Sequence, residues 1–307
     1  MTRRITTVAV LSLALVTIAG AARAIEGRAW GDIHVQTMDG VNYEFQSSGE
    51  YFASRSAAGD FEVQLRLESS GFSPNVSVAT AVAVQVDSSR ASVALGREPT
   101  LWVDGQPAEL ADGFLDLPDG GRIERAKRGY EIYWSDGSIL TVKVKKRHIN
   151  VFLNPAESRR GTLSGLFGNF NGIGADDVEA TLANVDSGSG SDSQLRAGLI
   201  SLAQSLFAED EDPRLLTQEV SLFEYEPGQT TFSFRRPPPS REATAAALPA
   251  ASRRRALEAC EAAGVTDPEL LEACIVDVGY TRDESFAESA AEVQERNSTH
   301  WDAVAAR

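Results

Sequence analysis

The stretch Tyr130–Val144 decides the fold class of this 307-residue chain, and it reads Tyr-Glu-Ile-Tyr-Trp-Ser-Asp-Gly-Ser-Ile-Leu-Thr-Val-Lys-Val. Apolar and polar residues alternate on both sides of Asp136-Gly137, which is the pattern of two strands that each bury one face. An Asp-Gly pair between such runs favours a tight turn, because glycine adopts positive φ at little steric cost. The stretch therefore predicts an antiparallel β-hairpin.

The same pattern continues upstream of this hairpin. Further strand-like runs occur at Tyr51–Ala53, Phe61–Leu67, Val76–Val78, Val82–Val86 and Ser92–Leu95. Asp-Gly pairs also occur at residues 104–105, 112–113 and 119–120. Many short strands with frequent turns are typical of a β-sandwich. We predict a mainly β fold, an antiparallel β-sandwich followed by a small α-helical C-terminal hairpin.

Downstream of the hairpin lies a glycine-rich loop, residues 165–177, which reads Gly-Leu-Phe-Gly-Asn-Phe-Asn-Gly-Ile-Gly-Ala-Asp-Asp. Its glycines predict a backbone that turns repeatedly, and Asn169, Asn171, Asp176 and Asp177 add short oxygen-bearing side chains. Oxygen donors on a folded-back loop suit a hard cation such as calcium, whereas the sulfur and imidazole ligands of zinc or copper are absent from this stretch. From the residues alone, the loop is either a turn between strands or a cation site.

The N-terminal residues 1–24 have the composition of a signal peptide. Arg3 and Arg4 precede a mostly apolar run over residues 8–18, and an Ala-Arg-Ala sequence follows at residues 22–24. We therefore expect a secreted or periplasmic protein with no membrane span after removal of this segment; an uncleaved anchor is the alternative. The net charge of −15 argues against nucleic acid as a partner.

The C-terminal part of the chain has a different composition. After a β domain over residues 25–235, the Pro- and Ala-rich residues 236–251 predict a semi-rigid linker, and residues 252–307 predict an α-helical region. Ser252 is a candidate N-cap of a helix that ends near Gly264, and Thr266 or Asp267 is a candidate cap of the next one. Cys260 and Cys274 would lie at similar heights in such a hairpin, so we expect a disulfide between them.

A second motif lies near the start of the β domain, where residues 30–40 read Trp-Gly-Asp-Ile-His-Val-Gln-Thr-Met-Asp-Gly. It resembles the opening Gly-Asp-Pro-His…Thr-Phe-Asp-Gly of the von Willebrand factor type D domain. The loop at residues 165–177 resembles the closing Gly-Leu-Cys-Gly-Asn-Phe-Asn-Gly…Asp-Asp of the same family. The two motifs occur in the family's order over roughly residues 28–180. The chain is most similar in type to bacterial, cysteine-poor members.

The resemblance implies a β-sandwich in which one calcium ion joins the start of the domain to its closing loop. Such an ion would act as a cross-link that favours the folded state. Matched residue by residue, the resemblance assigns as ligands Asp32, Asn169, Asn171, Asp176 and Asp177, together with the backbone carbonyl of Ile173.

Several positions depart from the family pattern. Ile33 stands where proline is usual, and Met38 where phenylalanine is usual. Phe167 replaces the loop cysteine, and Gly49 precedes Glu50 where animal members often have cysteine. The disulfide-linked multimerisation and thiol exchange of animal members are therefore not implied. We expect Phe167 to fill space in the core instead.

Other candidates for catalysis or binding are few. The chain has three histidines, His34, His148 and His300, and no Gly-x-Ser-x-Gly elbow. We interpret His34 as a structural residue rather than as a catalytic base, because no nucleophile is evident beside it. The basic residues 143–147 either bind an anionic glycan or phosphate or form a solvated strand face.

The leading functional hypothesis is a secreted, calcium-stabilised and non-enzymatic binding or structural module in adhesion, matrix or envelope contacts. Its partner is an unknown protein or glycan. The alternative is an extracellular hydrolase with a metal–carboxylate site at the Gly165–Asp177 loop, although calcium activates water only weakly beside zinc. Lipid carriage is a third interpretation, and it would require an apolar cavity.

Overall fold

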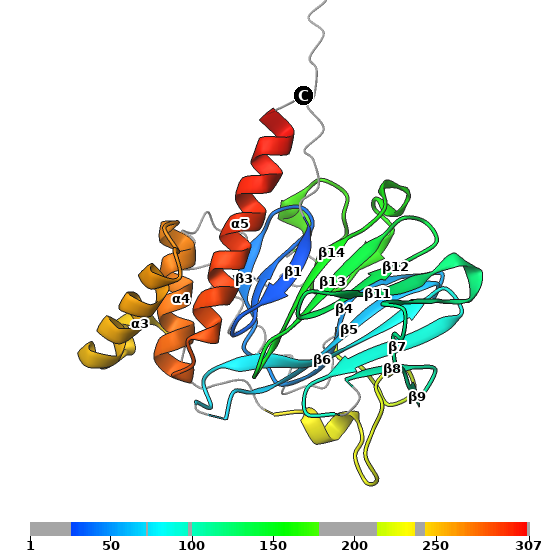
Figure 1. Ribbon diagram of the computed structural model, residues 1–307, viewed down its shortest axis with the longest axis horizontal. Coiled ribbons are helices and arrows are strands. Elements are labelled where there is room, and N and C mark those ends of the chain that lie inside the picture. The colour runs from blue at the N-terminus through cyan, green and yellow to red at the C-terminus, as the bar shows by residue number, and fades with distance from the viewer. Residues whose placement is uncertain (1–25, 72, 98–99, 178–213, 237–242, 306–307) are drawn as a thin grey trace, which may run out of the picture.

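Two antiparallel β-sheets pack face to face, and three α-helices lie beside them in the described part of the chain (Figure 1). The computed structural model describes residues 26–71, 73–97, 100–177, 214–236 and 243–305. The predicted signal segment, residues 1–24, lies outside the described residues. The predicted fold class, a mainly β sandwich with a helical tail, is confirmed.

The first sheet joins the start of the chain to the hairpin that decides the fold class. The predicted hairpin is formed by β12 and β13, with Ile132 opposite Leu140. The N-terminal strand β1 pairs with β14, so that Ala29 lies opposite Val151. In sheet order the strands are β10 (Phe114–Asp116), β11 (Arg122–Ala126), β12 (Gly129–Tyr133), β13 (Ile139–Val144), β14 (Ile149–Asn154), β1 (Gly27–Trp30), β2 (His34–Gln36) and β3 (Asn42–Glu44).

The second sheet contains most of the strands predicted upstream of the hairpin. In sheet order they are β15 (Leu163–Ser164), β4 (Gly49–Ser56), β5 (Phe61–Ser69), β6 (Ser77–Val86), β7 (Ser89–Ala94), β8 (Leu101–Val103) and β9 (Gln106–Pro107). The two runs predicted at residues 76–78 and 82–86 belong to one strand, β6, with a register shift opposite Arg66 and Leu67. Such a bulge lets one strand continue through an irregular stretch of the pattern. Short 3₁₀ helices occur at Pro118–Gly120 and Glu157–Arg159.

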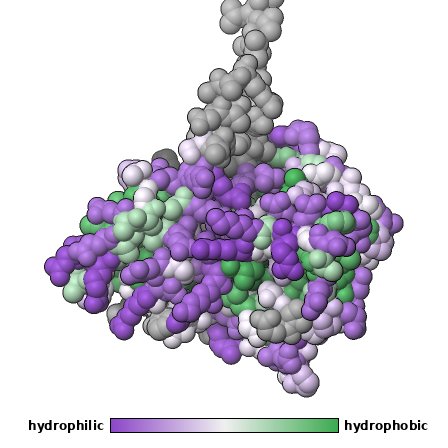
Figure 2. All heavy atoms as spheres, in the orientation of Figure 1, coloured by the Kyte–Doolittle hydropathy of each residue, from purple (hydrophilic) through white to green (hydrophobic). Residues whose placement is uncertain are grey.

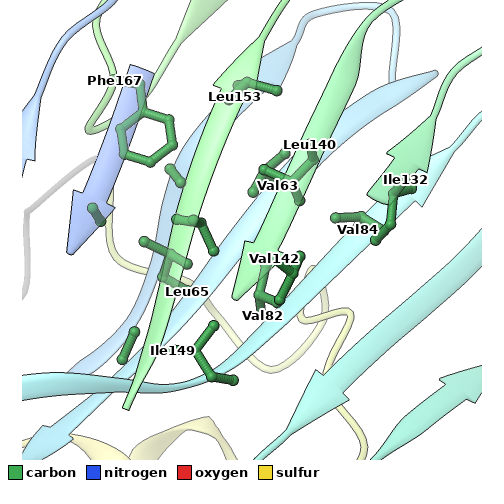
Figure 3. Close-up of a cluster of buried hydrophobic side chains, with 14 of the residues drawn as sticks. Val63, Leu65, Val82, Val84, Ile132, Leu140, Val142, Ile149, Leu153 and Phe167 are labelled. Carbon is green, nitrogen blue, oxygen red and sulfur yellow. The ribbon is translucent and has the colours of Figure 1, made fainter. Parts of the chain in front are cut away.

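The main hydrophobic core lies between the two sheets (Figure 3). Alternate residues of each strand point into it, which is the arrangement that the period-two pattern predicts. The second sheet contributes Val63, Leu65, Val82 and Val84, and the first sheet contributes Ile132, Leu140, Val142, Ile149 and Leu153. Phe167, from the closing loop, is fully buried in the same core, as expected.

The segment of residues 214–236 covers the outer face of the second sheet. Leu216 and Phe223 pack on Phe52 and on the small side chains of β6 and β7. At the centre, the Nε of Arg66 donates to Glu50 at 2.7 Å, and the hydroxyl of Tyr225 bonds the other oxygen of Glu50. A 3₁₀ helix, Thr231–Phe234, ends the segment. Glu50 of β4 and Arg66 of β5 can be buried beneath the segment because each charge is paired with the other.

The helical region contains α3 (Ala250–Ala262), α4 (Pro268–Thr281) and α5 (Ser285–Ala305). The predicted hairpin is α3 and α4, joined by the disulfide between Cys260 and Cys274, and α5 adds a third helix. The Asp267 side chain accepts from the amides at the start of α4, as expected for a cap. Ser252 is not a cap: α3 begins two residues earlier, and Pro249 occupies its N-cap position without a side-chain bond.

The structure describes residues 236 and 243–251 of the predicted linker, and the stretch 243–251 contacts the helices. Within it, a 3₁₀ helix forms at Ala245–Ala247, and Ala245 and Leu248 are buried in the helical cluster. A Cβ on Gly279 would lie 2.2 Å from Leu248, so a glycine in α4 allows this close approach.

The helices dock on the outer face of the first sheet, at β14 and β1, through apolar and charged contacts. Phe286 of α5 stacks on His148 with ring centroids 4.1 Å apart. Lys145, from the predicted basic stretch, lies 3.3 Å from Glu292 of α5 and is largely buried. The face of the molecule shown in Figure 2 is mostly hydrophilic, with smaller apolar patches, in line with the net charge of −15. The basic stretch thus contacts the chain's own helices.

Candidate functional site

The closing loop, residues 165–177, is anchored to both sheets by backbone hydrogen bonds. The Met38 amide donates to the Phe167 carbonyl at 2.9 Å, and the Phe167 amide donates to the Ala53 carbonyl at 2.8 Å. Gly165 has a φ of +133°, and a Cβ there would lie 2.7 Å from the Ala53 carbonyl oxygen. Glycine therefore allows the loop to pass close to β4, which fixes its position relative to the sandwich.

Asp39, which follows β2, binds the backbone of this loop. Its carboxylate accepts from the Asn171 amide at 3.0 Å and from the Gly172 amide at 2.9 Å. These residues are more than 130 positions apart in the sequence. The start of the domain and its closing loop are thus joined directly at Asp39.

The predicted loop ligands lie together. The Nδ2 groups of Asn169 and Asn171 donate to the two carboxylate oxygens of Asp176, at 3.0 and 2.6 Å. The Asn169 amide donates to Asp177 at 2.9 Å. The Oδ1 of Asn171 accepts from the Ile173 amide at 2.7 Å, a local turn typical of asparagine. The carbonyl of Ile173 accepts from the Asp176 amide at 3.3 Å.

The charge balance of the loop is strongly negative. The pKa of Asp177 is raised, mainly by burial and further by the carboxylates of Asp39 and Asp176. Hydrogen bonds from the Thr37 hydroxyl and from the Asn169 amide act in the opposite direction. The Oδ2 atom of Asp177 is buried and has no hydrogen-bond partner among the described residues. Gly168 leaves room for this carboxylate, since a Cβ there would lie 2.1 Å from Oδ1. A buried carboxylate oxygen beside two like charges is an environment that a bound cation could complete.

Asp32 lies at a different place in the fold. It occupies the turn between β1 and β2, where Gly31 and Ile33 have φ values of +62° and +67°. Asp39 follows the opposite end of β2. The side chain of Asp32 is fully buried, and its Oδ1 lies 3.1 Å from Nε2 of His34.

Five of the six predicted metal residues thus lie in the closing loop, whereas Asp32 lies in the turn between β1 and β2. Sequence reasoning missed Asp39, although it belongs to the same opening motif, in the sequence Thr37-Met38-Asp39-Gly40. The opening motif has one aspartate before β2 and one after it, so the sequence offered both as candidate partners of the closing loop. The choice between them depends on which end of β2 faces the closing loop.

Comparison with known proteins agrees with this architecture. The family model of the von Willebrand factor type D domain matches residues 27–181, about half of the chain, and this range contains both sheets and the closing loop. The chain belongs to the von Willebrand factor type D domain family. Type D domains are generally binding modules rather than enzymes, and they occur typically in extracellular proteins.

Sushi domain-containing protein 2 from Homo sapiens is a relative of this chain. It is 28% identical over 165 residues, which is 48% of this chain and 19% of the human protein. The chain thus matches about a fifth of the length of that relative. Segment 214–236 and helices α3, α4 and α5 lie beyond the range of the type D family model. The helices that the structure describes are each too short or too polar to cross a membrane.

Proposed function

We propose that this chain is an exported, non-enzymatic binding module whose type D domain is stabilised by one calcium ion. The observation that carries the proposal is the set of oxygen atoms around Asp39 and the closing loop, where the buried Oδ2 of Asp177 has no partner among the described residues. Asp39, Asp176 and Asp177 would supply carboxylate oxygens, the donors that calcium prefers.

Neutral oxygens would complete the coordination. The Oδ1 atoms of Asn169 and Asn171 each accept one backbone amide, and an amide oxygen has a second lone pair available. The carbonyl of Ile173, whose side chain is 58% exposed, lies on the same loop. An all-oxygen set with three carboxylates fits calcium better than zinc or copper.

Calcium bound here would hold the closing loop against Asp39 and so favour the folded state. A ligand at one hundred times its dissociation constant adds about 2.7 kcal/mol to the free energy of unfolding. For a domain of this size, that corresponds to a rise in melting temperature of about 5–10 °C. The expected effect is therefore large enough to measure directly.

The test is a calcium titration of the full chain after chelation, followed by thermal unfolding. Asp39→Asn and Asp176→Asn should abolish the calcium-dependent rise in melting temperature, because each removes a carboxylate from the loop. Asp32→Asn is the matched control and should retain the rise. An unchanged melting temperature on chelation of the wild type would refute calcium stabilisation. Loss of the calcium-dependent rise in melting temperature in Asp32→Asn alone would show that Asp32, rather than Asp39, is the calcium ligand.

For the binding role, we propose a protein or glycan partner in extracellular, matrix or envelope contacts, supported by the family and by the acidic composition. Calcium-loaded wild type and the Asp39→Asn variant are matched baits for capture from an envelope or matrix fraction. A partner retained by the loaded protein and lost with the variant supports the proposal. Turnover of glycosidase, esterase or peptidase substrates that disappears in Asp176→Asn would instead establish the hydrolase alternative.

A further inference from the structure

A second cluster of metal-ligating side chains lies between the sandwich and the helical region. His34 Nε2 is 2.9 Å from Oδ1 of Asp277 and 3.1 Å from Oδ1 of Asp32. One ligand atom from each of these three residues lies within 4.8 Å of the others, and all three residues are buried. Asp32 and His34 flank the turn between β1 and β2, whereas Asp277 is in α4, 243 residues from His34. The cluster therefore connects the type D domain to the helices that follow it.

Both ring nitrogens of His34 contact carboxylates, and these contacts indicate which nitrogen could bind an ion after losing its proton. Nδ1 lies 2.6 Å from Oε1 of Glu44, so a proton on Nδ1 is held by that carboxylate when Nε2 serves as the ligand. Nε2 then faces Asp32 and Asp277. Metal-binding histidines in proteins usually donate their other ring N–H to a carboxylate in this way, which orients the ring and increases the basicity of the ligating nitrogen.

The cluster places two buried carboxylates around one imidazole. The electrostatic neighbours of Asp32 are Asp277, His34 and Glu44, of which only His34 can carry positive charge. Oδ2 of Asp32 and Oδ2 of Asp277 are both buried and have no hydrogen-bond partner among the described residues. Two fully buried carboxylates with unpartnered oxygens are costly unless a proton or a cation compensates them.

We propose that Asp32, His34 and Asp277 bind one divalent transition-metal cation of the zinc class, with Glu44 as the positioning residue for His34. The donor set is one imidazole nitrogen and two carboxylates, which zinc accepts and which is distinct from the all-oxygen set of the closing loop. In a tetrahedral site, ligands at about 2.0–2.2 Å from one zinc ion lie about 3.3–3.6 Å from one another. The observed separations of 2.9 and 3.1 Å are slightly shorter than this, so the side chains would move apart by a small amount to admit the ion.

A metal at this position would attach α4 to the turn between β1 and β2. Gly31 contributes to the fit, because a Cβ there would lie 2.3 Å from Oδ2 of Asp277. The site would form only when the helices are docked, so metal binding and docking are thermodynamically linked. The competing explanation is that protons alone neutralise the cluster, and metal binding distinguishes the two.

The test measures zinc bound by the full chain after chelation and dialysis, by metal analysis and calorimetry, together with thermal unfolding with and without zinc. The wild type should bind one zinc per chain and unfold at a higher temperature in its presence. Asp277→Asn, which preserves side-chain shape, should lose both effects. Ser289→Ala is the matched control, since Ser289 lies at the same interface and bonds His148 and Asn150 rather than the cluster. It should retain both.

Two further variants keep the result interpretable. Glu44→Gln, at a partly exposed position, should weaken zinc affinity about 10- to 100-fold without removing a ligand. Asp39→Asn should lose the calcium response and keep the zinc response, so the two sites fail independently. Absence of zinc binding by the wild type would overturn the proposal and leave the proton-neutralised cluster. Zinc affinity unchanged in both Asp277→Asn and Glu44→Gln would also overturn it, by placing the ion elsewhere.

Discussion

His148 is a buried histidine whose substitution should change how the stability of the protein depends on pH. Its side chain is fully buried between β14 and α5, with Nε2 2.8 Å from the hydroxyl of Ser289. Burial lowers the pKa of His148 from 6.5 to about 3; the positive charge of Lys145 lowers it further, and Asp283 acts in the opposite direction. The imidazole is therefore neutral in the folded protein over the ordinary pH range.

The sign of the effect follows from the two protonation states. Below pH 6.5 the unfolded chain takes up a proton on this residue and the folded chain does not, so the free energy of unfolding decreases as the pH falls toward 3. The contribution of His148 to the free energy of unfolding is fully present above pH 6.5, and between pH 6.5 and 3 it is lost at about 1.4 kcal/mol per pH unit. Between pH 7.5 and 4.5, the loss due to His148 is about 2.5 kcal/mol.

The assay is urea unfolding of the wild type and of His148→Gln at a series of pH values from 7.5 to 4.5, monitored by circular dichroism. Glutamine can bond Ser289 but does not ionise in this range, so the variant should lack this part of the pH dependence. Burial lowers the pKa of His34 while its carboxylate neighbours raise it, with a net rise, and this contribution is common to both proteins and cancels in the difference. Parallel stability curves for the two proteins would refute the reasoning. An NMR titration of the His148 ring in the wild type gives an independent value.

Three further changes have expected effects on stability. Phe167→Ala should lower the free energy of unfolding by about 3–5 kcal/mol, because it empties a fully buried site. Phe232→Ala, at a residue that is 62% exposed, should change the free energy of unfolding little. Equal urea midpoints for the two variants would contradict the role of Phe167 in the core. Replacing Cys260 and Cys274 by serine should cost about 3 kcal/mol and increase proteolysis within the helical region first; cleavage in the sandwich at the same rate would contradict this local effect. Glu50→Gln should lower the free energy of unfolding by about 3–5 kcal/mol and expose segment 214–236 to protease, because it leaves the buried Arg66 without its carboxylate partner. Protease protection equal to that of the wild type would show that the ion pair does not hold the segment.

Local patterns were sufficient for much of the fold. The hairpin of β12 and β13 follows from alternation on both sides of one Asp-Gly pair, because the side-chain period of a strand is a property of a few consecutive residues. The disulfide was also predictable locally, because Cys260 and Cys274 are only 14 residues apart, on two helices joined by a short turn. Of the two candidate caps of α4, Thr266 and Asp267, the structure uses Asp267, whereas Ser252 is not a cap because α3 already begins at Ala250.

The candidate site was predicted in part. The oxygen donors of the closing loop were visible in sequence because they lie within one short stretch that must fold back on itself. The distant partner was not, because Asp32 and Asp39 belong to the same motif and lie at opposite ends of β2. Only the pairing of β2 in the first sheet decides which of them meets the loop.

The sequence by itself determined the β character of the chain, the positions of its tight turns, the disulfide and the donor atoms of the closing loop. These features depend on residues close together in the chain, where backbone geometry and side-chain period restrict the outcome. Only the tertiary structure decided that Asp39 meets Asn171 and that His34 meets Asp277. Such contacts join residues far apart in the sequence, and they depend on strand register and helix docking. Those in turn are set by packing summed over the whole core, which no local stretch contains.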